Sequence, residues 1–114
     1  MEINVEAQIE ATVVDMEGAN GVTMKVLIGP KDGSQNIVMR LFIVAPGGKT
    51  PFHSHGFEHI VKIEKGRGVI VNEKKEKHEV EAGQSTFIEG GQGHQFQNPF
   101  DEPFEFLCII PSQA

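Results

Sequence analysis

The sequence predicts an all-β fold of the sandwich or barrel type in a single domain. Short runs rich in Val, Ile and Phe alternate with turn sequences that contain Gly, Pro and Asn, at a spacing of roughly ten residues. No stretch combines a helical hydrophobic period with capping residues. The 114 residues leave room for one hydrophobic core, without a separate substrate domain.

Three strands are predicted in the first part of the chain. The run 23–28 begins after Asn20-Gly21 and ends at Gly29-Pro30. The run 37–45 is the longest and ends at a predicted turn, Pro46-Gly47-Gly48. The run 60–64 ends at Lys65-Gly66.

Four further strands are predicted toward the end of the chain, over residues 68–72, 78–81, 85–88 and 104–110. Alternating Lys and Glu residues around 73–79 indicate a solvated hairpin, so His78 is predicted to be a surface residue. We expect residues 1–20 to form a lead segment that packs on the barrel or on a partner subunit. Residues 21–114 are expected to form the single domain.

Charge and cysteine content exclude several classes of partner and suggest a compartment. A net charge of −6 argues against binding to nucleic acid or to an anionic membrane, which require a basic patch. The single cysteine, Cys108, cannot form an intrachain disulfide. The sequence contains no basic apolar leader and no apolar run long enough to span a bilayer, and we therefore expect a cytoplasmic protein.

Four of the five histidines have a spacing typical of a metal site built on β-strands. His53 and His55 are two residues apart, so on one strand their imidazoles would point to the same face. His59 keeps the same parity. Around His94 the sequence alternates strictly, which puts His94 and Phe96 on an inward face and Gln95 and Gln97 on the other. A buried imidazole needs a hydrogen bond or a metal, and the four together favour a metal.

Both histidine segments resemble the two sequence motifs of the cupin superfamily of small β-barrels. The first motif is matched by Gly47, His53, His55, His59 and Gly66, and the second by Gly83, Gly91, His94 and Asn98 at the family spacing. Two positions depart from the pattern. Glu89 replaces a proline, and His59 replaces the usual carboxylate ligand.

The chain is most similar to small single-domain cupins that bind manganese through four histidines. The resemblance implies an antiparallel double-stranded β-helix, or jelly roll, with His53, His55, His59 and His94 as ligands of one divalent transition metal per chain. It implies manganese first and iron second, while imidazole ligands also suit nickel, copper and zinc. Gln95, Gln97 and Asn98 are candidates for orienting the imidazoles.

A rival pattern overlaps the first motif. Residues 55–59 spell H-x-x-E-H, a zinc-protease signature that requires a helix with both histidines on one face. Gly56 and the β-branched Ile60-Val61 argue against such a helix. Glu58 has odd parity and is expected to point away from the metal, either behind the ligands or on the surface.

Four residues are predicted to line a pocket beside the metal. Phe96 shares the face of His94, and Phe106 and Cys108 share the face opposite Glu105. Arg40 is the one long cation in an otherwise apolar run. It either holds a structural carboxylate or meets an anionic group of a substrate.

Two functions remain open from the sequence. One is a manganese- or iron-dependent enzyme that oxidises or decarboxylates a small oxygenated organic substrate, as the resemblance implies. The other is a non-catalytic module that binds a metal or small ligand. In both, four neutral imidazoles leave the metal charge uncompensated, which favours an anionic or oxygenated ligand. Exposed sheet edges and the lead segment suggest a homodimer.

Overall fold

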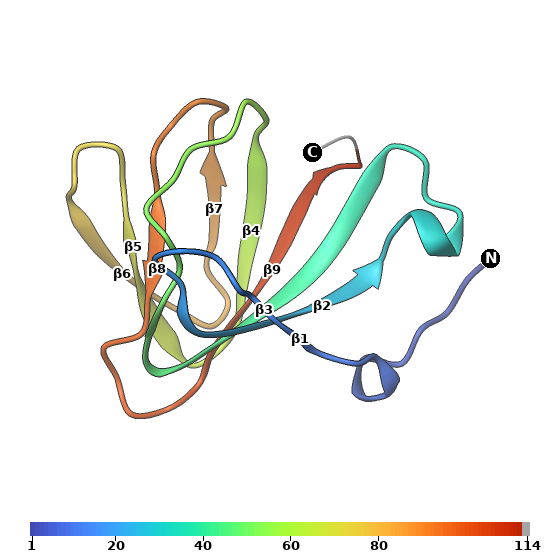
Figure 1. Ribbon diagram of the computed structural model, residues 1–114, viewed down its shortest axis with the longest axis horizontal. Coiled ribbons are helices and arrows are strands. Elements are labelled where there is room, and N and C mark those ends of the chain that lie inside the picture. Colours follow the sequence, from blue (N-terminus) through green and yellow to red (C-terminus); the bar gives the residue numbers. More distant parts are fainter. Residues whose placement is uncertain (113–114) are drawn as a thin grey trace.

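The computed structural model describes residues 1–112 and confirms the predicted all-β fold. Nine strands form one curled antiparallel sheet, with two 3₁₀ helices near the start of the chain (Figure 1). The elements are η1 (Glu6–Gln8), β1 (Thr12–Val13), β2 (Asn20–Ile28), η2 (Pro30–Asp32), β3 (Ile37–Lys49), β4 (His59–Lys65), β5 (Arg67–Val71), β6 (Lys77–Glu81), β7 (Ser85–Ile88), β8 (Gln95–Gln97) and β9 (Phe104–Pro111). No helix of the described residues is long and apolar enough to cross a bilayer.

The long strand β3 connects the parts of the sheet. The strand order is β6-β5-β8-β3-β9-β4-β7, and β2 pairs with both β1 and β3. Along residues 37–44, β3 pairs with β9, while its last residue, Lys49, pairs with Gln97 of β8. Since β9 in turn pairs with β4, both β3 and β9 lie between β8 and β4, the strands that follow the two histidine segments.

The predicted turn at Pro46-Gly47-Gly48 is wrong, because β3 continues through it to Lys49. Val44 faces Val22 of β2, and the next pair is Lys49 with Asn20, so several residues of β3 bulge opposite Gly21. Gly47 has a φ of 79°, which favours glycine, and a Cβ on Gly48 would lie 2.7 Å from the carbonyl oxygen of Asn20. The glycines therefore serve a bulge inside a strand rather than a chain reversal.

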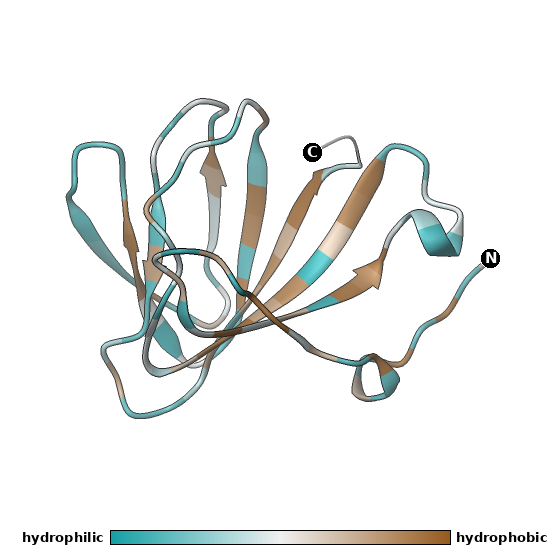
Figure 2. Ribbon diagram, in the orientation of Figure 1, coloured by the Kyte–Doolittle hydropathy of each residue, from teal (hydrophilic) through white to brown (hydrophobic). Residues whose placement is uncertain are grey.

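The core lies inside the curled sheet and follows the alternation of β9. Phe104, Phe106, Cys108 and Ile110 are buried there, and the residues between them are partly exposed. Figure 2 shows β9 as largely hydrophobic and β6 as largely hydrophilic. The exposed His78 lies on β6, with its Nε2 3.1 Å from the side-chain amide of Asn72, as expected for a surface residue.

The N-terminal segment lies against β2. Thr12 and Val13 of β1 pair with Met24 and Thr23, and the Asn4 side-chain amide donates to the Leu27 carbonyl at 2.9 Å. Val14 packs against the core. These contacts hold the segment that follows β1 over the interior of the barrel.

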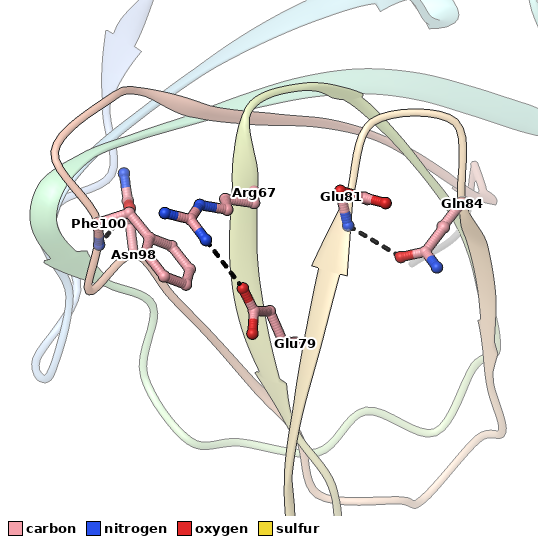
Figure 3. Close-up of polar contacts among 6 residues, drawn as sticks. All are labelled: Arg67, Glu79, Glu81, Gln84, Asn98 and Phe100. Atoms are coloured by element: carbon pink, nitrogen blue, oxygen red, sulfur yellow. Dashed lines mark hydrogen bonds and ion pairs between the residues drawn. The ribbon is translucent and has the colours of Figure 1, made fainter.

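Asn98, at the end of the second motif, shapes the loop before β9. Its side chain is buried, donates to the carbonyls of Val44 and Glu102, and accepts a hydrogen bond from the Phe100 backbone N–H (Figure 3). The Arg67 guanidinium lies over the Phe100 ring, 4.0 Å from its centroid. Asn98 therefore supports the backbone and does not orient an imidazole.

Two polar contacts at the surface hold β6, one to β5 and one in the turn that leads to β7. Arg67 pairs with Glu79 across the two strands, with an N–O distance of 3.3 Å (Figure 3). After β6, the Gln84 side-chain carbonyl accepts the Glu81 backbone N–H at 2.9 Å. Both partners of the Arg67–Glu79 pair are exposed, so the pair contributes little to stability.

Candidate metal centre

The two motifs meet through their backbones at an isolated β-bridge between His53 and His94. The His94 N–H donates to the His53 carbonyl at 2.9 Å, and the His53 N–H donates to the His94 carbonyl at 3.1 Å. His53 precedes β4 and His94 immediately precedes β8, so segments distant in sequence are fixed side by side. This bridge sets the relative position of their imidazoles.

The four predicted ligands form one cluster of rings. Potential ligand atoms of His53, His55 and His94 all lie within 4.8 Å of one another, a spacing suited to one metal ion. His59 lies beside this trio, with its ring centroid 4.9 Å from that of His55 and 5.0 Å from that of His94. Histidines whose spacing predicts a common face therefore do lie together in the structure.

Two nitrogens in the cluster are buried and have no hydrogen-bond partner among the residues that the structure describes. They are Nε2 of His59 and Nε2 of His94, on residues that are 4% and 2% exposed. The other nitrogen of His94, Nδ1, lies 2.9 Å from the Gln92 carbonyl oxygen, which can only accept. Nδ1 therefore carries the proton of neutral His94, and the lone pair of Nε2 is free. Such a donor set fits a metal ion, because leaving these atoms unpaired in the interior is costly.

Stacking fixes the orientation of two of the rings. The His55 ring stacks on Phe57 at 4.7 Å and on His59 at 4.9 Å, with interplanar angles of 10° and 11°.

Glu58 is exposed, in line with its expected direction away from the cluster. Residues 56 and 57 form a bend and β4 starts at His59, so the helix that a zinc-protease signature requires is absent from residues 55–59.

Burial favours the neutral form of three of the imidazoles, those of His53, His55 and His59. It lowers the pKa of His53 to about 4 and the pKa of His59 to about 3, and the neighbouring histidines and Arg40 add to both effects. The pKa of His55 is also lowered, first by burial and then by the charges of His94 and Arg40. Neutral imidazoles with free lone pairs are the form that binds metals.

We expect the metal-free protein to lose stability as the pH falls from about 6.5 toward 4. The pKa values of folded His53 and His59 lie below the 6.5 of an ordinary histidine, so the unfolded chain binds more protons in this range. Protonation therefore favours unfolding. Thermal unfolding across this pH range should give a smaller slope for a His53→Gln/His59→Gln variant than for the wild type. An unchanged slope would contradict the lowered pKa values.

The cluster forms one wall of a cavity of about 330 Å³. Arg40, Phe96, Phe106 and Cys108, the four predicted pocket residues, all line it. The rest of the lining is mostly apolar and comes from the N-terminal segment and neighbouring strands: Thr12, Val13, Val14, Asp15, Met16, Met24, Phe42, Thr50 and Pro51. A cavity of this size can hold a small organic molecule.

Cys108 lies next to the histidine cluster, and Arg40 lies next to Cys108. The Cys108 Sγ lies 3.4 Å from His59 Nδ1 and 3.6 Å from the Arg40 guanidinium. Burial raises the pKa of the Cys108 thiol, and Arg40 only partly offsets this effect, so the thiol is neutral at pH 7. Apart from the histidines, the titratable residues that line the cavity within residues 1–112 are Arg40, Cys108 and the exposed Asp15.

Sequence reasoning missed three contributions to the site. The segment 12–16 has no strand signal beyond a short apolar run, yet it covers the cavity. Met24 and Phe42 also line the cavity. Phe42 could have been predicted, because it is two residues from Arg40 on the same strand and therefore faces the same side. The partner of His94 is the carbonyl of Gln92. The predicted candidates Gln95 and Gln97 instead bond to the Thr50 carbonyl and to each other.

Comparison with known proteins agrees with this architecture. The polyketide cyclase RemF from Streptomyces resistomycificus superposes with a TM-score of 0.94 at 30% identity, over 98% of this chain and 80% of that chain. A predicted oxalate decarboxylase from Thermotoga maritima superposes with a TM-score of 0.85 at 24% identity, over 96% of this chain and 98% of that chain. The second likeness concerns the fold alone.

A curated relative matches a smaller region. It is 1-methylthio-D-xylulose 5-phosphate methylsulfurylase from Rhodospirillum rubrum, 35% identical over 75 residues, which are 66% of this chain. The chain spans about half the length of that relative, 47%. The family described as "Cupin domain" matches residues 40–110, from the first part of β3 to the last part of β9. Its match covers both histidine motifs and most of the curled sheet, and the chain therefore belongs to the cupin family.

Proposed function

We propose that His53, His55, His59 and His94 hold one divalent transition metal, and that the adjoining cavity binds a small oxygenated organic substrate on which the protein acts as an enzyme. The observation that carries this proposal is the pair of buried, unpartnered Nε2 atoms of His59 and His94 beside His53 and His55. Manganese is our first choice and iron the second, from the four-histidine resemblance.

The reaction that the cavity supports best is an oxidation. A metal at the cluster would supply Lewis-acid or redox activation of a substrate oxygen. The other titratable residues that line the cavity within residues 1–112 are Arg40, which offers only N–H donors, the neutral thiol Cys108 and the exposed Asp15, so none of them is a buried general base. The apolar walls exclude water and position the carbon skeleton. Decarboxylation of oxalate fits less well, because oxalate has no apolar part to contact these walls.

A second candidate is ring closure of an oxygenated substrate. The observation that favours it is the likeness to RemF, a polyketide cyclase, over nearly the whole chain. Ring closure needs no dioxygen, whereas oxidation by dioxygen does. Turnover that continues at the same rate under argon would favour the second candidate.

The metal site is tested by adding manganese to the metal-free protein. We expect about one metal per chain by elemental analysis after gel filtration. We also expect the melting temperature to rise by about 10 °C at a metal concentration near 100 times the dissociation constant. Iron, zinc, nickel and copper, added in the same way, show which metal binds best. A protein that takes up none of these metals and gains no stability would contradict the proposal.

A further inference from the structure

The cavity beside the histidine cluster contains an arginine that pairs with no carboxylate of the described residues. The Arg40 Nε is buried and makes no hydrogen bond, and a terminal guanidinium nitrogen reaches only the Cys108 sulfur at 3.6 Å. The ion pairs found within residues 1–112, Lys62–Glu64 and Arg67–Glu79, do not involve it. Within residues 1–112, Arg40 therefore holds no structural carboxylate, which is one of the two roles the sequence left open.

The interior of this acidic protein is positive where the cavity lies. The chain carries a net charge of −6, but the cavity is lined by the Arg40 guanidinium, and the only carboxylate among the described lining residues, Asp15, is exposed. A metal at the cluster would add two more positive charges beside Arg40. Burying such charges without a counter-ion is costly, so an anionic group on the ligand would be stabilised there.

The rest of the lining recognises a different part of the ligand. Phe42, Phe106, Met24 and Val14 form apolar walls, and the Phe42 ring lies under the Arg40 guanidinium at 4.9 Å. Flat rings pack well on such aromatic and thioether surfaces. A fully polar dianion would leave these walls unused.

We propose that the cavity selects organic monoanions, each with one anionic oxygen group that Arg40 binds and a flat apolar body that packs on Phe42, Phe106 and Met24. This inference names the substrate class of the proposed enzyme and rests on that function for the role of the metal. Arg40 is the residue that determines specificity, since a planar guanidinium can form two hydrogen bonds to a carboxylate or enolate.

Calorimetric titration of the metal-loaded protein tests the proposal with three probes. Benzoate has both features, benzamide is its neutral counterpart, and oxalate lacks the apolar body. We expect the wild type to bind benzoate more tightly than benzamide or oxalate. Arg40→Gln should weaken benzoate binding by about 10- to 100-fold, the usual loss for a charge-assisted hydrogen bond, and change benzamide binding by less than about 3-fold.

Matched variants and metal analysis separate the outcomes. Arg67→Gln removes an exposed arginine that lies outside the cavity and should leave benzoate binding unchanged, while Arg40→Lys should retain part of it. Equal losses for benzoate and benzamide, tighter binding of oxalate, or no benzoate binding by the loaded wild type would overturn the inference. If elemental analysis finds no metal, the proposed function fails by itself. Dependence on Arg40 in that metal-free protein would still support the anion site.

Discussion

Replacing His94 by alanine is expected to weaken metal binding by at least about 100-fold. Loss of a residue that only hydrogen-bonds to a metal ligand typically weakens binding by about 10- to 100-fold, and loss of the ligand itself should cost more. His94 is 2% exposed, its Nδ1 is held by the Gln92 carbonyl, and its free Nε2 faces the cluster. Alanine removes this donor but keeps the backbone bridge to His53. Competition with a chromophoric chelator measures the affinity.

Two further variants show whether that loss is specific. His78→Ala removes an exposed histidine on β6 and should leave metal affinity unchanged. His59→Ala tests the fourth donor, and we expect a loss similar to that of His94→Ala. If His94→Ala binds metal as tightly as the wild type, the assignment of the site is wrong. If only His59→Ala does so, the site has three histidine ligands.

Replacing Phe104 by alanine is expected to lower the free energy of unfolding by about 3–5 kcal/mol, the usual cost of removing a large buried ring. Phe104 is 0% exposed and its ring packs on the Phe106 ring at 5.2 Å. The ring also fills the space above Gly68, where a Cβ would collide with it. β9 is hydrogen-bonded to a strand on each side, so the sheet cannot easily move to fill the space that the removed ring would leave.

Urea denaturation measures this loss, with Phe87→Ala as the matched control. Phe87 lies on β7 and is 52% exposed, so its loss should cost no more than about 1 kcal/mol. Similar midpoint shifts for the two variants would mean that Phe104 is not part of the core. Since Phe104 does not line the cavity, metal binding by folded Phe104→Ala should be retained.

The period of two in β-strands explains what the sequence could predict. Every second residue of β9 is buried, and the same parity correctly put His94 and Phe96 on the inner side. The cluster of four histidines also depends on the β-bridge between His53 and His94, which joins the two motifs. Local patterns that repeat along a strand are therefore readable without a structure.

Features that depend on distant segments could not be read in this way. The bulge of β3 exists because β2 pairs on both sides of it, and Pro46-Gly47-Gly48 alone has the composition of a turn. The segment 12–16 covers the cavity through pairing with β2, which its own composition does not indicate. That Arg40 pairs with no carboxylate of residues 1–112 is likewise evident only from its three-dimensional surroundings.

The bridge between His53 and His94 also bears on how the chain folds. The two residues belong to segments far apart in sequence, so closing the loop between them costs conformational entropy that only the assembled barrel repays. The unfolded chain therefore contains no preformed ligand set. An ion that joins both segments would act as a removable cross-link: it would hold the closed barrel together and slow its opening, but it would not guide the first steps of folding.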